Sequence, residues 1–203
     1  MEGLKLILIV DYKMGNLPNV KRAVELFTKD VIISSDVEDI KKADKILLPG
    51  VGAFGDAIRN IESLGLREAI TEAAKTKPFM GICLGMQLMF EKSEEDPTVQ
   101  GLGIIKGRVE KFKNIELKIP EIGWNSVSKP KESNILKGIE DNSYFYFVHS
   151  FHVVPEEDVA AGITNYGYDF VSVIEKDNIM ATQFHPEKSH DEGLKILKNF
   201  IEL

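Results

Sequence analysis

The sequence predicts a mixed α/β fold in which helices flank a mainly parallel central sheet, with an antiparallel extension in the C-terminal half. Two observations predict it. Up to about residue 90, short apolar runs alternate with helical segments, which is the pattern of βαβ units. Beyond about residue 94, short strand candidates separated by turn signals follow one another. A chain of 203 residues can form one substantial core, so we expect a single domain over residues 1–203.

The first half begins with Leu4–Val10, a continuous apolar run that is typical of a strand covered on both faces. Gly15 and Asn16 form a turn, and Pro18 suits the first turn of a helix that runs to about Phe27. Further strands are predicted at Val31–Ser34, Lys45–Leu48 and Phe79–Ile82. Further helices are predicted from the Asp36 cap to Lys42, after Gly55 as far as Lys75, and over Leu84–Phe90.

The second half begins with a polar loop, Ser93–Gly101, and continues mainly as strands. The strand candidates are Ile104–Phe112, Ile122–Val127, Tyr144–Val148, Val159–Thr164, Phe170–Glu175 and Ile179–Phe184. Turn signals separate them, among them Tyr166–Asp169 and Asp177–Asn178. A final helix is predicted where Leu194, Leu197 and Ile201 share one face.

The composition excludes some classes of function. The net charge of −7 argues against binding to nucleic acid, which requires a basic surface. The single cysteine cannot form an internal disulfide, and this favours a reducing compartment. The first apolar run is too short to span a bilayer, and no small-residue cleavage site follows it. We therefore expect a cytoplasmic protein with no nucleic acid and no membrane as partner.

The only cysteine lies in Gly81-Ile82-Cys83-Leu84-Gly85, a G-x-C-x-G segment that joins a predicted strand to a predicted helix. This pattern is the thiol version of the nucleophile elbow. The turn is so sharp that a Cβ two residues before or after the nucleophile would collide, which explains both glycines. It leaves the sulfur at the carboxyl edge of the sheet and at a helix N-terminus, where thiolate is favoured. Cys83 could instead be a small buried hydrophobe, but the elbow favours a nucleophile.

A cysteine nucleophile needs a base that takes and returns a proton, and usually a third group that orients the base. His185 follows the apolar strand Ile179–Ala181 and is followed by Pro186 and Glu187. Because Pro186 ends the strand and stiffens the link, the two polar side chains can face the same way. We therefore predict that His185 is the base and that Glu187 accepts the proton on its other ring nitrogen.

The other three histidines are weaker candidates for the base. His149 is the rival, because it follows the predicted strand Tyr144–Val148, but it has no carboxylate two residues later. His152 and His190 have no such setting, and we interpret them as structural or solvent-facing.

Residues Gly50–Gly55 match G-x-G-x-x-G after a strand and before a helix, and Glu72 lies at a tolerable distance for a ribose contact. Alone, this match would suggest a dinucleotide site. However, it follows the third strand rather than the first, and Pro49 precedes it. An elbow also needs a second oxyanion donor from a neighbouring loop, where glycines let a backbone amide approach closely. We therefore interpret Gly50–Gly55 as an oxyanion loop.

Three segments together resemble the signatures of the class I (triad-type) glutamine amidotransferases: Pro49–Gly52, Gly81–Gln87 and Gln183–Glu187. Further segments resemble one family of this class, the glutaminase subunits of imidazole glycerol phosphate synthase from histidine biosynthesis. They are Asp11-Tyr12 with Gly15-Asn16, Pro49–Gly55, Phe90-Glu91 with Ser93–Glu95, Ile122–Asn125, Tyr146–Ser150 and Glu187–Ser189. The resemblance spans nearly the whole chain. It implies a flavodoxin-like fold and hydrolysis of L-glutamine to glutamate and ammonia.

The resemblance also implies roles that spacing alone does not assign. The bound glutamine would be held by Gly50, Gly52, Gln87, Glu95, His149, Ser150 and Phe151. The amides of Val51 and Leu84 would form the oxyanion hole. The peptide at Val51 would have to reorient before the hole is complete, which would link catalysis to the state of a partner.

A partner is implied as well, near an ammonia gate that would include Pro120, Ile122, Trp124 and Lys188. Trp124 is the only tryptophan, and a core role would explain it as well as an interface role. Glu121 stands where a small or apolar residue is expected.

Free ammonia would be protonated and lost in water, so the product must pass through a shielded route to an obligate partner. The resemblance implies a heterodimer with a (β/α)8-barrel cyclase subunit, which makes imidazole glycerol phosphate and aminoimidazole-carboxamide ribotide. The chemistry needs no metal and no organic cofactor. One alternative is the glutaminase subunit of another class I synthase, in the anthranilate, purine or pyridoxal phosphate pathway. An inactive regulatory module and a flavodoxin-like nucleotide binder are the others.

Overall fold

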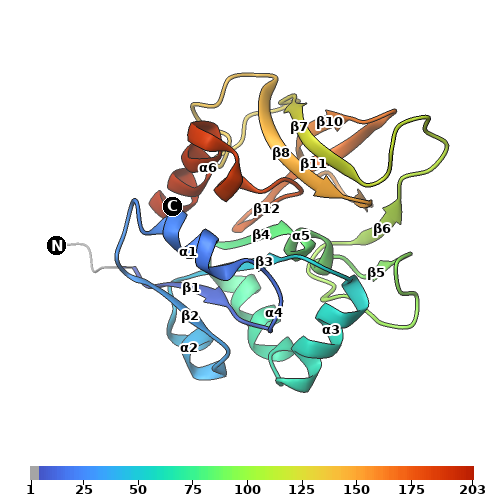
Figure 1. The fold of residues 1–203 in the computed structure, drawn as a ribbon. Coiled ribbons are helices and arrows are strands. Elements are labelled where there is room, and N and C mark those ends of the chain that lie inside the picture. Colours follow the sequence, from blue (N-terminus) through green and yellow to red (C-terminus); the bar gives the residue numbers. More distant parts are fainter. Residues whose placement is uncertain (1–4) are drawn as a thin grey trace.

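A parallel sheet forms the centre of the molecule (Figure 1). The computed structural model describes residues 5–203, so the predicted start of the first strand at Leu4 lies outside the described residues. The parallel strands, in spatial order, are β2 (Val31–Ser34), β1 (Ile7–Val10), β3 (Lys45–Gly50), β4 (Phe79–Cys83) and β12 (Ile179–Thr182). The register pairs Gly50 with Cys83, and Ile82 with Thr182. The predicted oxyanion loop, nucleophile and base therefore follow three neighbouring strands at one sheet edge.

Strands of the C-terminal half extend this sheet. Beyond β12 lie β11 (Asp169–Lys176), β9 (Phe151–Pro155), β6 (Gly107–Lys111) and β5 (Lys92–Ser93), and β10 (Ala160–Asn165) pairs with β11. All these pairings are antiparallel except that of β5 with β6. A separate antiparallel ribbon consists of β7 (Glu121–Val127) and β8 (Ser143–His149). The predicted fold class, a mainly parallel sheet with an antiparallel extension, is confirmed.

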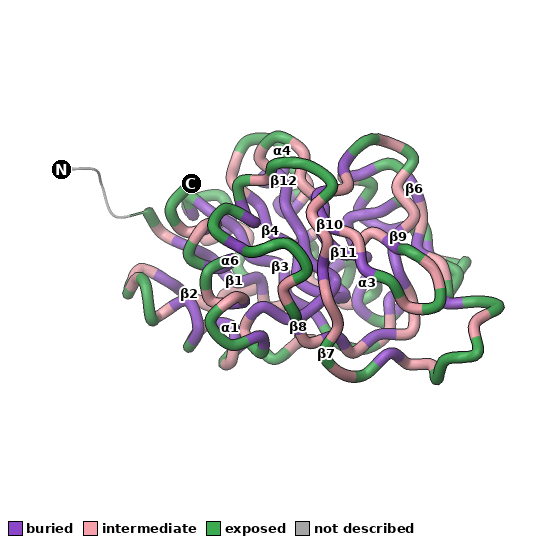
Figure 2. The backbone as a smooth tube through the Cα atoms, turned by 90° about the horizontal axis from the view of Figure 1, so that it is seen from above, coloured by how far each residue is buried: buried purple, intermediate pink, exposed green. Residues whose placement is uncertain are grey.

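Helices cover both faces of the sheet. In Figure 1, α1 (Leu17–Val24) and α6 (His190–Glu202) lie on one side, and α2 (Val37–Lys42), α3 (Phe54–Ser63) and α4 (Arg67–Thr76) lie on the other. The apolar run of β1 serves both sides: Ile7 and Ile9 join the core with α1 and α6, while Leu8 and Val10 join the core with α2 to α4. Figure 2 shows buried backbone along β3 and β4. Within residues 5–203, no helix has the length and apolarity to cross a bilayer.

The structure differs from the prediction in one helical segment, which is divided, and in two strands, β5 and β9, that the sequence pattern does not predict. The helical segment predicted between Gly55 and Lys75 is two helices, because Gly65 turns the chain with φ +67°, a conformation that glycine adopts at little cost. No strand is predicted over Phe151–Pro155, which forms β9 between β11 and β6. Only Ser150 separates β9 from β8, so no turn signal marks the start of a new strand.

Lys45 is a buried lysine whose replacement we expect to destabilise the fold. The residue is about 1% exposed, and Nζ donates to the carbonyl oxygens of Phe200 (3.1 Å) and Ile201 (2.6 Å) in the last turn of α6. These carbonyls have no donor within the helix. Burial lowers the pKa of Lys45 to about 8, so the ammonium group is still protonated at pH 7.

The variant Lys45→Met keeps the apolar stem but leaves both carbonyls without this donor. We expect the free energy of unfolding at pH 7 to fall by about 1–3 kcal/mol in urea titrations. Lys198→Met is the matched control on α6, because its exposed ion pair with Glu202 should contribute less than about 1 kcal/mol. Equal stability of the Lys45→Met variant and the unchanged protein would contradict this account.

Candidate active site

Cys83 lies where β4 ends and the short helix α5 (Leu84–Leu88) begins. Its backbone has φ 54° and ψ −111°, a conformation that is strained for a residue other than glycine. The residue is about 6% exposed, and it is the only cysteine in the chain. The predicted sharp strand-to-helix turn is therefore present at this residue.

The flanking glycines allow this turn because no side chain fits at either position. A Cβ on Gly81 would lie 2.7 Å from Met89 Sδ and 2.8 Å from the Met86 nitrogen. A Cβ on Gly85 would lie 1.7 Å from the carbonyl oxygen of Leu48 in β3. These distances are shorter than van der Waals contact, so α5 can pack against β3 and β4 only with glycine at both sites.

His185 and Glu187 form a buried pair beside the elbow. His185 Nδ1 lies 2.8 Å from Glu187 Oε1, and His185 lies directly before the 3-10 turn Pro186–Lys188, which starts with the predicted stiff link. Their side chains are about 3% and 1% exposed. Within the described residues His185 Nε2 has no hydrogen-bond partner, so this nitrogen is available for the Cys83 sulfur.

The charge state of His185 depends on its neighbours. Burial disfavours the imidazolium, but the Cys83 side chain and the Glu187 carboxylate outweigh burial and raise the pKa of His185 to about 10. An imidazolium that persists at neutral pH beside a cysteine is typical of a thiolate–imidazolium pair.

Removing the sulfur should therefore lower the pKa of His185. In the Cys83→Ala variant, burial acts against only one remaining partner, Glu187, so the His185 ring should lose its proton at lower pH than in the unchanged protein. The measurement is an NMR titration of the His185 ring nitrogens from pH 5 to 11. His152, whose pKa is lowered by burial without a contribution from Cys83, is the internal control and should titrate alike in both proteins. Identical titration of His185 in the two proteins would contradict the pairing with Cys83.

His149, the rival base, is engaged elsewhere. Its Nδ1 lies 2.7 Å from the carbonyl oxygen of Phe151, and its Nε2 lies 3.0 Å from Glu121 Oε2. Because both ring nitrogens have partners, His149 has no free nitrogen for Cys83. The Glu121 carboxylate comes from the neighbouring strand β7, a contact that sequence spacing does not reveal. The arrangement favours His185 as the base.

The remaining histidines fit their structural interpretation. His152 is buried, with Nε2 2.8 Å from the Tyr168 hydroxyl, and burial lowers its pKa. His190 is exposed and stacks on Trp124, with ring centroids 4.9 Å apart.

A cavity of about 420 Å³ opens in front of Cys83. Its lining brings together most of the residues that the sequence assigns to the site: Val51, Gly52, Cys83, Leu84, Gln87, Glu95, Pro120, Val148, His149, Ser150, Phe151 and Lys188. Gly50 lies behind this surface, and a Cβ on it would meet the Tyr12 hydroxyl at 2.0 Å. A volume of this size suits a small molecule such as an amino acid.

Two side chains that line the cavity are held by other parts of the protein. Glu95 accepts a hydrogen bond from the Phe54 amide at the start of α3 (2.8 Å). Gln87 Nε2 donates to the Phe151 carbonyl (3.0 Å) and to Gln183 Oε1 (3.1 Å). Both side chains are thus fixed before any ligand arrives.

The two residues whose amides are the predicted oxyanion donors line the cavity from two elements. Leu84 is the first residue of α5, where a backbone N–H has no partner within the helix. Val51 directly follows β3, and the carbonyl of Pro49, within β3 and two residues earlier, accepts a hydrogen bond from the buried Tyr12 hydroxyl (2.8 Å). The loop that carries Val51 is thereby tied to the core at its base.

The predicted partner face divides into two parts. Pro120 and Lys188 line the cavity, and Lys188 Nζ lies 5.7 Å from the ring centre of Tyr146. Ile122 and Trp124 do not line it; they are about 63% and 45% exposed on β7. The exposure of Trp124 argues against a core role for the only tryptophan.

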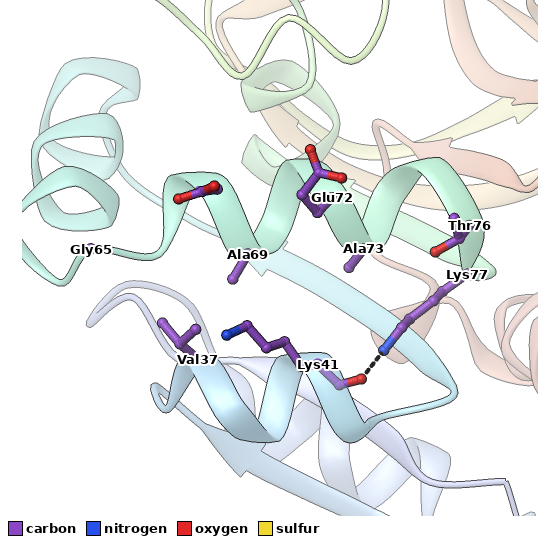
Figure 3. Close-up of a pocket in the computed structure, with 9 residues that line it drawn as sticks. Val37, Lys41, Gly65, Ala69, Glu72, Ala73, Thr76 and Lys77 are labelled. Atoms are coloured by element: carbon purple, nitrogen blue, oxygen red, sulfur yellow. Dashed lines mark hydrogen bonds between the residues drawn. The ribbon is translucent and has the colours of Figure 1, made fainter.

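A second hollow of about 380 Å³ lies between α2 and α4 (Figure 3). Val37, Ala69 and Ala73 give it apolar walls, and Lys77 donates to the Lys41 carbonyl across it. Glu72, which the dinucleotide interpretation required, lines this hollow and not the cavity at Cys83. None of the predicted catalytic residues lines it, so the cavity at Cys83 is the better candidate site.

Sequence reasoning missed two polar residues at the site. Gln183 is fully buried, and its Nε2 lies 3.8 Å from Cys83 Sγ. Glu121 is about 3% exposed and pairs with His149. The sequence contains a hint for each residue. Gln183 is the first residue of the signature segment that contains His185, and Glu121 is a carboxylate at a position where an apolar residue is expected.

Comparison with known proteins identifies a matching family and several similar proteins. The family model described as glutamine amidotransferase class-I matches residues 8–203. The chain is 53% identical over 203 residues to imidazole glycerol phosphate synthase subunit HisH 1 of Methanococcus maripaludis, covering 98% of this chain and 100% of that protein. It is 55% identical over 196 residues to subunit HisH of Methanocaldococcus jannaschii, covering 96% and 98%.

Solved structures support the same fold. A structure of PurLQS from Thermotoga maritima aligns with a TM-score of 0.75 at 18% identity and covers 98% of each chain. The glutaminase domain of CTPS from Trypanosoma brucei, solved with bound acivicin, aligns with a TM-score of 0.67 at 16% identity, covering 98% of this chain and 94% of that one. At these identities the likeness supports the fold alone.

Proposed function

The chain belongs to the class I glutamine amidotransferases, and we propose that it hydrolyses L-glutamine as the glutaminase subunit of an imidazole glycerol phosphate synthase. The observation that carries the proposal is the strained Cys83 at a small-molecule cavity, next to the buried His185–Glu187 pair. Among residues 5–203, His185 Nε2 has no hydrogen-bond partner. The substrate class follows from the family, and the partner follows from the names of the relatives.

The reaction begins with attack of the Cys83 thiolate on the carboxamide carbon of glutamine. The C–S bond forms as the C=O π electrons move to oxygen, and the amides of Val51 and Leu84 stabilise the resulting O⁻. His185, held protonated by Glu187 and the sulfur, gives its Nε2 proton to the leaving nitrogen. The C–N bond breaks, ammonia departs and a glutamyl thioester remains.

The second half of the reaction releases glutamate. Neutral His185 takes a proton from water, and the water oxygen attacks the thioester carbon. The tetrahedral intermediate collapses with the sulfur as leaving group, so the thiolate and the imidazolium are both regenerated. Glu187 stabilises the imidazolium at each stage and keeps Nε2 pointed at the reacting atoms.

The cavity walls would bind the rest of the glutamine molecule. We assign contacts to Gln87 and Glu95, and to the backbone of His149–Phe151, because all of them line the cavity in front of the sulfur. Gly50 and Gly52 keep the oxyanion loop close to the substrate without side-chain collisions.

The ammonia would pass to a cyclase subunit with a (β/α)8 barrel in a cytoplasmic heterodimer. Two observations support a partner surface here: Pro120 and Lys188 line the cavity, and Ile122 and Trp124 are exposed on the adjacent ribbon. A partner seated there would receive ammonia before solvent protonates it, and would make imidazole glycerol phosphate and aminoimidazole-carboxamide ribotide.

Reconstitution tests this assignment. Glutamate release should rise strongly when the cyclase and its nucleotide ligand are added, and should not rise with synthase subunits of the anthranilate, purine or pyridoxal phosphate pathways. The readout is an enzyme-coupled glutamate assay at equal protein concentrations. Strong activation by one of the other synthases, and none by the cyclase, would overturn the proposed partner.

A further inference from the structure

We propose that Gln183 is a further residue of the reaction site, whose side-chain N–H faces the Cys83 sulfur and stabilises its thiolate form. The proposal rests on the proposed function, since it names a group that acts on the same nucleophile. Gln183 follows β12, is fully buried, and places Nε2 3.8 Å from Cys83 Sγ.

A chain of hydrogen bonds fixes which end of the Gln183 amide faces the sulfur. The carbonyl oxygen of Phe151 can only accept, so the Gln87 atom 3.0 Å from it must be the NH₂ nitrogen. That nitrogen gives its second N–H to the Gln183 side chain at 3.1 Å, which must therefore present its oxygen. With Oε1 turned toward Gln87, the NH₂ group of Gln183 is the end that points at Cys83.

The hydrogen bonds beyond the Phe151 carbonyl, at the other end of this network, also have defined partners. His149 Nδ1 also donates to the Phe151 carbonyl (2.7 Å), so both lone pairs of that oxygen are used. His149 Nε2 lies 3.0 Å from Glu121 Oε2, and Glu121 Oε1 accepts from the side chain of Asn125 (2.8 Å). Because each group has a defined partner in a buried setting, Gln183 has little freedom to turn its amide over.

A neutral donor at this position complements the charged groups around the sulfur. His185, which is paired with Glu187, lies beside Cys83. Tyr12 also lies near the sulfur: burial raises the pKa of the Tyr12 hydroxyl, and the charge of Cys83 raises it further. A hydrogen bond to the charged form of a group favours that form. The Gln183 N–H does not titrate, so it continues to stabilise the sulfur as leaving group after His185 has given its proton to ammonia.

The test is the pH dependence of alkylation of Cys83 by iodoacetamide, followed by intact-protein mass. Cys83 is the only cysteine, so the rate reports a single thiolate and requires neither glutamine nor a partner. Gln183→Met preserves length but has no N–H. We expect the midpoint of the rate profile to move up by about one pH unit, so that the alkylation rate at pH values below the midpoint falls roughly tenfold.

Thr182→Val is the matched control. Thr182 precedes Gln183, is equally buried, and donates its hydroxyl to the Phe184 carbonyl (3.0 Å) rather than to the sulfur. Its variant loses a buried hydrogen bond of the same kind, so its melting temperature should fall while its alkylation midpoint stays at that of the unchanged protein. An equal midpoint shift in Thr182→Val would overturn the proposal.

A second variant, Gln183→Glu, allows the same measurement if Gln183→Met does not fold. Gln183→Glu keeps the shape and the acceptor for Gln87 but replaces the donor that faces the sulfur, so its midpoint should also rise. A folded Gln183 variant that titrates like the unchanged protein would refute the role of Gln183. That result differs from failure of the proposed function, which would appear as a reconstituted, unmodified complex that releases no glutamate.

Discussion

Replacing Cys83 with alanine should abolish glutamine hydrolysis in the complex and leave its ammonia-driven cyclase reaction intact. The thiolate is the nucleophile that the elbow presents to the carboxamide, because Cys83 lies at the cavity wall beside the His185–Glu187 pair. Loss of the nucleophile of a comparable triad lowers kcat by roughly a millionfold. Supplied ammonia bypasses this step, so the partner should keep most of its rate.

Two measurements check this expectation on one sample: glutamate release from glutamine, and cyclisation at saturating ammonium chloride. Cys83→Ser is the control for shape, because it keeps a similar volume with a much poorer nucleophile and should fail in the same way. Glutamine hydrolysis at a tenth of the original rate or more in Cys83→Ala would show that another group attacks the amide.

Replacing Gly85 with alanine should destroy the elbow. The added Cβ would lie 1.7 Å from the Leu48 carbonyl oxygen and 2.8 Å from its carbon, and both are backbone atoms of the central strand β3. Neither can move without disrupting the sheet, so α5 must shift away and carry Leu84 and Cys83 with it. We expect a loss of about 3 kcal/mol or more of folding free energy, and glutaminase activity lowered at least a hundredfold.

Gly103→Ala separates this collision from the general effect of replacing a glycine. Gly103 has φ +65°, but a Cβ there meets nothing within 4 Å. The only cost is that alanine disfavours this left-handed backbone conformation, so the free energy of unfolding should fall by roughly 1–2 kcal/mol and activity should be retained. Urea unfolding and the glutamate assay report both quantities, and equal behaviour of the two variants would contradict a steric role for Gly85.

Local pattern was enough to predict the parallel half of the fold and the elbow. Each strand there is a short apolar run bounded by a turn signal, and the glycines around Cys83 have a steric cause that acts within a few residues. The His-x-Glu pair was also predictable, because Pro186 fixes the geometry between the two residues. Family resemblance, rather than spacing, supplied Gln87 and Glu95 as residues that line the cavity.

Long-range contacts could not be predicted in the same way. The pairing of Glu121 with His149 and the contact of Gln183 with Cys83 join residues 28 and 100 positions apart, and depend on strand register. β9 was missed because it follows β8 after a single residue, without the glycine or proline that marks most turns.

The most direct test of the central claim is acid quench of the reconstituted complex during turnover of glutamine, followed by mass analysis of this chain. We predict a transient increase by one glutamyl group, located on the peptide that contains Cys83, because the thioester must form before water releases glutamate. The adduct should be absent from Cys83→Ala. Steady release of ammonia with no adduct at any quench time, or with an adduct on another residue, would contradict nucleophilic catalysis by Cys83.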